Sequence, residues 1–98
     1  MDKEQKAIER MRLAAANEKF PPFHSAHEGW AVIMEELDEL KTEVNMADAS
    51  LTEACEHIKS NNPLAENKVN WVRSYAINAA CEAIQVAAMC RKFMEMGK

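Results

Sequence analysis

Apolar residues recur at steps of three and four along two long segments of this chain, and this spacing constrains the fold more than any other feature. The two stripes consist of Ala26, Trp30, Ile33, Leu37, Leu40 and Val44, and of Val69, Val72, Ala76, Ala79, Ala83, Val86, Cys90 and Phe93. Such spacing is typical of amphipathic helices. The chain has only two glycines and three prolines, which leaves little material for the turns of β-hairpins. The sequence therefore predicts an all-α fold in which the helices form a bundle.

Capping and breaking signals set the ends of the first two predicted helices. Residues 2 to about 19 are predicted to form the first helix, because a Pro-Pro pair follows them and blocks its continuation. Ser25 and Glu28 have the spacing of a capping box. A second helix is therefore predicted to begin near Ala26.

The second half of the chain holds one clear helix and one ambiguous segment. Residues 47–60 have a weaker apolar pattern and contain polar residues that also suit a loop. The pattern is therefore compatible with either a short fourth helix or a loop. Asn-Asn-Pro at 61–63 is a helix breaker. The last helix is predicted to begin at Leu64 or Asn67 and to end near Met94. The predicted architecture is three long helices with a possible short fourth.

The size and composition of the chain predict its assembly and compartment. Residues 1–98 make one domain, and a chain this short buries only about two-thirds of its unfolded surface, so we expect a homodimer or homotetramer. No apolar run approaches the ~18 residues of a membrane span, and the N-terminus is charged where a signal peptide would be apolar. The three cysteines lack C-x-x-C spacing and suit small core residues in a reduced compartment. We therefore expect a cytoplasmic protein with no membrane partner.

Acidic residues are concentrated in one segment of the chain. The formal net charge is −4, and the segment from Ala26 to Met46 holds six acidic residues against one lysine. This balance argues against duplex nucleic acid as a partner, because that binding needs a basic face. Glu36, Glu39 and Glu43 are spaced at three and four along one edge of the apolar stripe. They are interpreted either as a solvated charged face or as oxygen ligands for a hard divalent cation.

A second stripe on the last predicted helix is polar at its centre. It consists of Trp71, Tyr75, Asn78, Glu82, Gln85 and Met89. Burying Glu82 there would be costly without compensation, so this carboxylate is expected to face solvent, to pair with a lysine or to bind a metal ion. If the two long helices pack antiparallel, Glu36 and Glu39 can face Glu82 and Gln85 across the groove.

Several common catalytic motifs are missing from the sequence. It has no Gly-rich phosphate loop, no G-x-S-x-G and no Glu-x-x-His, which excludes the P-loop, serine-hydrolase and ferritin-like di-iron classes. His24 and His27 lack further zinc ligands at a diagnostic spacing, so capping or solvent contact is expected for them. Gly29 costs a helix about 1 kcal/mol relative to Ala. Close helix packing or a ligand would each explain this glycine.

Two segments resemble motifs of a known family. The stretch HEGWAVIMEELDE from His27 to Glu39 resembles the first motif, E-E-x-x-E, of the MazG-like all-α nucleoside triphosphate pyrophosphohydrolases. The stretch EAIQ is similar to their second motif, E-x-x-D, with Gln85 in place of the aspartate. The separation between the two motifs is longer than is usual in the family, consistent with an inserted segment around residues 47–63.

The resemblance implies a dimeric or tetrameric bundle that binds Mg²⁺, with Mn²⁺ as an alternative, and cleaves a nucleoside triphosphate to a monophosphate and pyrophosphate. The residues assigned to the metal are Glu36, Glu39, Glu82 and Gln85. Glu35 is assigned as the group that accepts a proton from the attacking water. Stripe geometry, and not the resemblance, makes Trp71, Tyr75 and Asn78 candidates for substrate binding, because rings stack on a base and an amide reads its edge.

The neutral Gln85 opens an alternative to catalysis. It removes one formal charge from the metal cage, and ligand charge is a main contributor to affinity for a hard cation. The first hypothesis is a Mg²⁺-dependent pyrophosphohydrolase acting on an NTP or dNTP. The second is a non-catalytic helical module for oligomerisation or nucleotide sensing that has lost activity.

Overall fold

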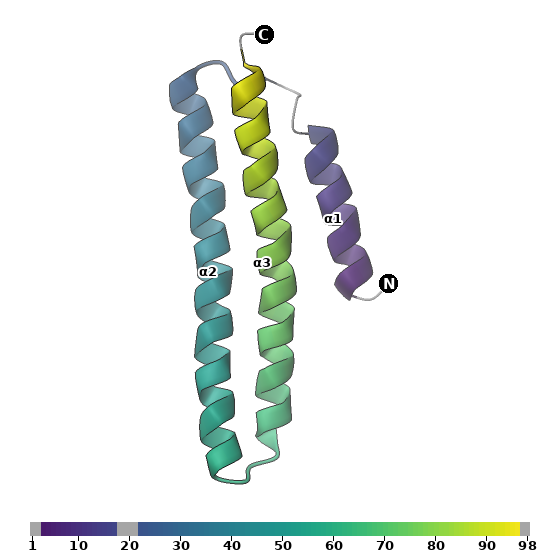
Figure 1. Cartoon of the computed structure of the whole chain (residues 1–98), viewed down its shortest axis with the longest axis vertical. Coiled ribbons are helices and arrows are strands. Elements are labelled where there is room, and N and C mark those ends of the chain that lie inside the picture. Colours follow the sequence, from purple (N-terminus) through teal and green to yellow (C-terminus); the bar gives the residue numbers. More distant parts are fainter. Residues whose placement is uncertain (1–2, 18–21, 97–98) are drawn as a thin grey trace.

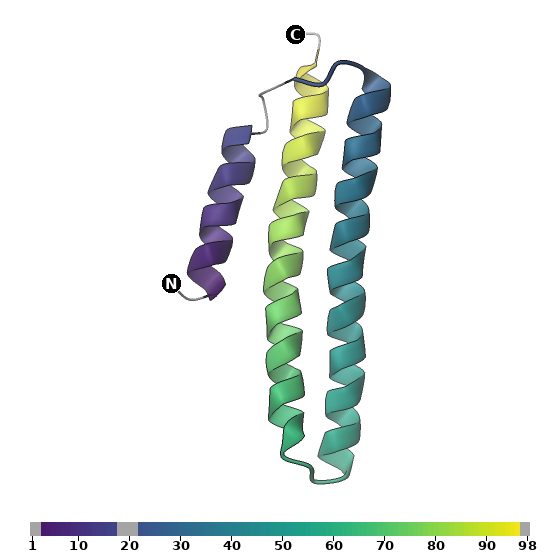
Figure 2. The ribbon, with the colours of Figure 1, turned by 180° about the vertical axis from the view of Figure 1, so that it is seen from behind.

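Three helices lie side by side in a single layer. The computed structural model describes residues 3–17 and 22–96, and its helices are α1 (Lys3–Asn17), α2 (Ala26–Lys59) and α3 (Leu64–Glu95). The predicted all-α fold is confirmed, and no strand occurs in these two ranges. Helix α3 lies between α1 and α2 and runs antiparallel to α2 (Figures 1 and 2). The Cα atoms span 58 × 29 × 12 Å, so the molecule is a slab about one helix thick.

The start of α2 follows from its predicted cap. Ser25 has an extended backbone, and its Oγ accepts a hydrogen bond from the backbone N–H of Glu28 at 3.1 Å. This contact satisfies one of the free N–H groups of the first turn. The predicted first helix is confirmed over Lys3–Asn17, whereas its predicted residues 2, 18 and 19 lie outside the described residues.

Residues 47–59 continue α2 without a break, so the separate short fourth helix and the loop were both wrong. The polar side chains that suggested a loop are accommodated within the helix, where the Thr52 hydroxyl donates to the carbonyl of Asp48 at 3.1 Å. Ala54 is buried, and Lys68 of α3 pairs with Glu53 at 2.6 Å. Contacts with α3 therefore hold this segment helical where its own apolar pattern is weak.

The predicted break at 61–63 forms the turn between the two long helices. Asn61 has a φ of 55°, the left-handed conformation that often follows a helix end. The N–H of Asn62 donates to the carbonyl of His57 at 2.8 Å, and the Asn62 side chain accepts from the N–H of Leu64 at 2.9 Å. One short segment thus caps the end of α2 and the start of α3.

This turn fixes which residues of α2 and α3 face each other. Glu53 pairs with Lys68, and further up the hairpin Glu43 accepts a hydrogen bond from Asn78. Both pairs are centred on the same point of the chain, between Ser60 and Asn61. On the facing sides of the two helices, positions equally far from this point are therefore placed near each other across the hairpin.

The core of this slab is small. Among the residues that the structure describes, the buried hydrophobic ones are Ala7, Phe23, Ala54, Cys81, Ala88 and Met89. Trp30 and Val44, which belong to the stripe predicted to face a core, are instead 59% and 51% exposed. Cys81 is buried and Cys90 is half-buried, but Cys55 is exposed, so its predicted place in a core was wrong. No helix in the described residues has a stretch long and apolar enough to cross a membrane.

The exposed surface is larger than a compact chain of this mass would have. The accessible area is 6844 Å², about a fifth more than the area expected for a folded monomer of 11.1 kDa. The radius of gyration of 17.1 Å likewise exceeds the ~13 Å expected for a compact domain of this length. The single layer therefore leaves apolar helix faces without a partner inside the chain.

Gly29 is explained by packing. It is buried on the first turns of α2, beside the cluster that Phe23 forms with Ala88 and Met89. A Cβ atom built on Gly29 would lie 2.6 Å from Cδ2 of Phe93 and 3.0 Å from Cδ2 of Phe23. The two rings therefore occupy the space that any larger residue would need.

We expect Gly29→Ala to lower the free energy of unfolding by about 1–2 kcal/mol, because the strain of overpacking outweighs the gain in helix propensity. The matched control is Ala49→Gly at an exposed position of the same helix, where Gly should cost about 1 kcal/mol. Thermal unfolding measures both, at roughly 4–8 °C per kcal/mol. An increase in Tm for Gly29→Ala would contradict the packing explanation.

Candidate functional site

Three glutamates from the two long helices meet on one side of the α2–α3 hairpin. Glu36 and Glu39 lie one turn apart on α2, and Glu82 faces them from α3. One carboxylate oxygen from each residue lies within 4.8 Å of the other two. We call these three residues the acidic cluster. The register of the hairpin produces it, because Glu39 and Glu82 are equally far from the turn.

The pKa values of Glu36 and Glu39 are raised by burial and by neighbouring carboxylates. Partial burial, followed by the charges of Glu82 and Glu35, raises the pKa of Glu36 above its ordinary value, and a hydrogen bond with Glu39 offsets part of this rise. Partial burial also raises the pKa of Glu39, together with a hydrogen bond to Glu82 and the surrounding negative charges. Ionising the whole cluster is therefore unfavourable without a nearby positive charge.

The donor set of the acidic cluster fits a hard divalent cation. Carboxylate oxygens are the ligands that Mg²⁺ and Mn²⁺ prefer in proteins, and three of them converge here from two rigid helices. A cation bound between these oxygens would relieve the repulsion that raises the pKa of Glu36 and Glu39.

Arg10 supplies the one ion pair to the acidic cluster within the described residues. Its Nη2 lies 2.9 Å from Oε1 of Glu82, and the Arg10 side chain is 50% exposed, whereas that of Glu82 is 14% exposed. The sequence allowed for a lysine partner of Glu82, but the partner is an arginine that comes from α1. In the structure, Arg10 lies three residues after the buried Ala7 and so near the face of α1 that packs on α3.

The other two residues assigned to the metal chemistry lie beside the acidic cluster. Glu35 is exposed on α2, and its charge contributes to the raised pKa of Glu36, but its carboxylate is not one of the three that converge. Gln85 is half-buried on α3, three residues after Glu82 and therefore on the same side of the helix. The role of Glu35 as proton acceptor and that of Gln85 as metal ligand remain proposals.

The three residues predicted to bind substrate lie along α3 on the hairpin-turn side of Glu82. The rings of Trp71 and Tyr75 are stacked, with centroids 5.8 Å apart and planes at 27°. At 1.5 Å per residue, Tyr75 lies about 10 Å and Trp71 about 16 Å from Glu82 along the helix axis. Asn78 lies between the rings and the cluster, and its Nδ2 donates to Oε2 of Glu43 at 3.3 Å. This contact holds the amide in one orientation.

His24, His27 and the segment 47–59 do not contribute to this site. His24 and His27 are both exposed beside the cap of α2, as predicted. The segment 47–59 extends α2 toward the turn, away from the acidic cluster (Figure 1). It therefore lengthens the hairpin and does not cover the cluster.

The repulsion within the acidic cluster predicts a dependence of stability on pH. In EDTA, we expect Glu39→Gln to raise Tm near neutral pH by a small margin, because exposed charges are screened. The folded state holds protons on Glu36 and Glu39 at a pH where the unfolded state has lost them, so stability falls as pH rises through the window between the unfolded and folded pKa values. Below that window the substitution should have no effect.

Glu53→Gln is the matched control for this experiment, with the opposite sign. The hydrogen bond from Lys68 lowers the pKa of Glu53, so this carboxylate stabilises the fold above its unfolded pKa, and that stability is lost as pH falls through its folded pKa. Thermal unfolding between pH 3 and pH 8 tests both. A fall in Tm at neutral pH for Glu39→Gln would contradict the repulsive character of the cluster.

Comparison with protein-family models, with curated proteins and with solved structures finds no match for this chain. The chemical assignment of the site therefore depends on its own side chains. They provide three convergent carboxylates, one arginine at their edge, and an amide and two stacked rings further along α3.

Proposed function

We propose that this chain is a Mg²⁺-dependent pyrophosphohydrolase that cleaves an NTP or dNTP to the nucleoside monophosphate and pyrophosphate. The observation that carries this proposal is the convergence of Glu36 and Glu39 with Glu82. These residues come from the two segments that resemble the motifs of the MazG-like family, and they are far apart in the sequence.

The side chains of this chain have separate roles in the proposed reaction. The acidic cluster holds the metal ion, with Gln85 as a neutral fourth donor. When bound there, Mg²⁺ supplies positive charge that neutralises the phosphate oxygens. Glu35 is exposed beside the cluster and is not needed as one of its three ligands, so it is free to accept a proton from the attacking water.

The nucleoside end of the substrate is assigned to α3. The exposed face of Trp71 is available to stack on a base. Tyr75 stacks on Trp71 and fixes the orientation of that ring, and Asn78 presents its amide nearer to the acidic cluster. The spacing along the helix places the base side of the site toward the turn and the phosphate side toward Glu82.

A panel of canonical and modified NTPs and dNTPs, incubated with Mg²⁺ or Mn²⁺ and analysed by chromatography, tests this function. Equal amounts of monophosphate and pyrophosphate are expected from at least one nucleotide. Release of orthophosphate and a nucleoside diphosphate would indicate cleavage of a different bond. No turnover with any nucleotide would overturn the enzymatic proposal.

The second candidate is a non-catalytic module that binds a metal-nucleotide complex. Two observations favour it: Gln85 stands where the family has a carboxylate, and the Arg10 guanidinium already compensates one charge of the cluster. A rise in Tm that requires both Mg²⁺ and a nucleotide, without turnover, would identify this function, because a ligand that binds only the folded state stabilises it by mass action.

We also propose that the chain assembles as a homodimer or homotetramer in the cytoplasm, where its three free cysteines suit a reducing compartment. On α2, four residues of a row repeating every seven residues are more than half exposed, namely Trp30, Val44, Leu51 and Ile58. Val69, Ala76 and Ala83 form an exposed row with the same repeat on α3. Such rows are the seams through which helices pair in bundles.

These two rows lie on one face of the hairpin. Leu51 and Ile58 of α2 and Val69 of α3 line the same groove, of about 590 Å³. A second hairpin packed on this face would complete a four-helix bundle. It would also cover apolar surface that the single layer leaves exposed, which is why the proposed occupant is a second copy of this chain.

A further inference from the structure

A second cavity lies between α1 and α3 and has a basic rim. It has a volume of about 160 Å³ and is lined by Lys3, Lys6 and Arg10 from α1 and by Asn78 and Cys81 from α3. The three basic residues are spaced at three and four, which places them along one face of α1. Neither Lys3 nor Lys6 was part of the site predicted from the sequence.

The floor of this cavity is fixed by packing. Ala7 and Cys81 are 7% and 4% exposed, and the Cys81 thiol donates to the carbonyl of Ala7 at 3.8 Å. At the far end of α1, Arg73 of α3 pairs with Glu4. These contacts, together with the pair of Arg10 and Glu82, dock α1 along α3 with its basic face turned to the cavity.

The cavity has an excess of positive charge. In residues 3–17 and 22–96, neither Lys3 nor Lys6 forms an ion pair, whereas Arg73 and Lys68 are each paired with a glutamate. Arg10 forms an ion pair with Glu82, and its side chain remains half exposed. Lysines near the start of a helix are also disfavoured by the helix dipole, so these residues do not stabilise α1 locally. The oxygens of a phosphate group match two or three lysine and arginine groups.

We propose that this cavity binds the pyrophosphate part of the nucleotide, beside the metal-binding acidic cluster. Arg10 joins the two sites, since it contacts Glu82 and lines the cavity, and Asn78, one turn before Glu82 on α3, lines the cavity as well. A phosphate chain held at the acidic cluster thus has a basic pocket next to it, on the side of α3 that faces α1. This inference rests on the proposed function, to which it adds the residues that recognise the leaving group.

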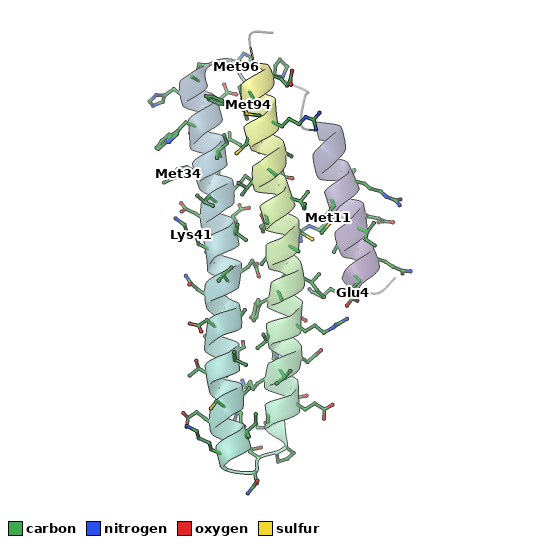
Figure 3. The ribbon with its side chains drawn as sticks, viewed as in Figure 1. Glu4, Met11, Met34, Lys41, Met94 and Met96 are labelled. Carbon is green, nitrogen blue, oxygen red and sulfur yellow. The ribbon has the colours of Figure 1, made fainter. Side chains whose placement is uncertain are left out.

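Titration calorimetry with inorganic pyrophosphate, in EDTA and without any nucleotide, tests the cavity separately from catalysis. The wild-type chain is expected to bind pyrophosphate, and Lys6→Gln and Lys3→Gln should each weaken binding about tenfold, the effect of losing one charged hydrogen bond. Lys6→Arg should retain binding. Lys41→Gln is the matched control, because Lys41 is exposed on the side of α2 away from α3 (Figure 3).

The outcomes distinguish this inference from the proposed function. Pyrophosphate binding that is absent, or equal in wild type and Lys6→Gln, overturns the inference even if hydrolysis is observed. Binding that depends on Lys6 supports the cavity, and it should survive Glu36→Ala, which removes the metal site alone. Circular dichroism of each variant compares its total helix content with that of the wild type, and the Lys6→Arg variant keeps the test valid if Lys6→Gln unfolds α1.

Discussion

Glu36→Ala is expected to reduce nucleotide hydrolysis by about 100- to 1,000-fold. A metal ion contributes several kcal/mol of charge stabilisation in a phosphoryl-transfer transition state, and each 1.36 kcal/mol corresponds to a factor of ten in rate. Glu36 supplies one of only three convergent carboxylates, so its loss leaves too few charged ligands to hold the ion. The rate of monophosphate formation with saturating Mg²⁺ measures the effect.

Asp38→Ala is the matched control for this prediction. Asp38 is an exposed carboxylate in the same turn of α2, and its side chain is not part of the acidic cluster. It should therefore leave turnover within about twofold of the wild type, since long-range effects of exposed charges are screened. Equal losses for Asp38→Ala and Glu36→Ala would show that net charge, and not a metal site, matters.

The same pair of variants tests the metal site without a nucleotide. Mg²⁺ or Mn²⁺ should raise Tm of the wild type and of Asp38→Ala, but not that of Glu36→Ala. A metal-induced shift that survives in Glu36→Ala would contradict the assignment of the cluster. In the absence of metal, Glu36→Ala should be slightly stabilising, because it removes one of the repelling charges.

The ends of the helices were predictable because short signals with a physical cause mark them. Ser25 caps α2 through its hydroxyl, and the Asn-Asn-Pro segment both ends α2 and starts α3. The continuation of α2 through residues 47–59 was not predictable in the same way. Its less exposed positions are Ala47, Ser50, Ala54 and His57, whose small or polar side chains carry little apolar signal, and pairing with α3 supplies the stabilisation.

The acidic cluster was predictable from the sequence as a consequence of the turn. Once a break at 61–63 joins two antiparallel helices, Glu39 must face Glu82, and Glu36 lies one turn away on the same side. The hydrogen bond between Asn78 and Glu43 was not predicted. Glu43 was part of the acidic edge, but its pairing with Asn78 depends on side-chain conformations.

The position of α1 lies beyond what the sequence pattern determines. Its helical spacing predicts an amphipathic helix, but nothing in that spacing says which of the other helices it packs against. The contact of Cys81 with Ala7 and the pair of Arg10 with Glu82 are therefore findings of the structure. They bring a basic helix face to the edge of the acidic cluster, the arrangement that the proposed metal-bound phosphate chain would use.

Leu51→Lys is expected to dissociate the assembled protein. Leu51 is 55% exposed and lies in the apolar row that we propose to pair with a second copy. In a symmetric dimer the substitution occurs twice, and each lost leucine removes about 2 kcal/mol of apolar burial, so the dissociation constant should rise by about a thousandfold or more. Light scattering coupled to gel filtration measures the change in mass.

Asn45→Lys is the control, because it introduces the same charge at an exposed polar position of α2 that lies outside the row. It should keep the assembled mass, whereas Leu51→Lys should approach the monomer mass of 11.1 kDa with its helix content retained. A monomeric wild type would contradict the assembly, and an unchanged mass for Leu51→Lys would place the interface elsewhere. If the monomeric variant still bound Mg²⁺ through Glu36, the acidic cluster would be complete within one chain, as its formation from α2 and α3 of a single hairpin requires.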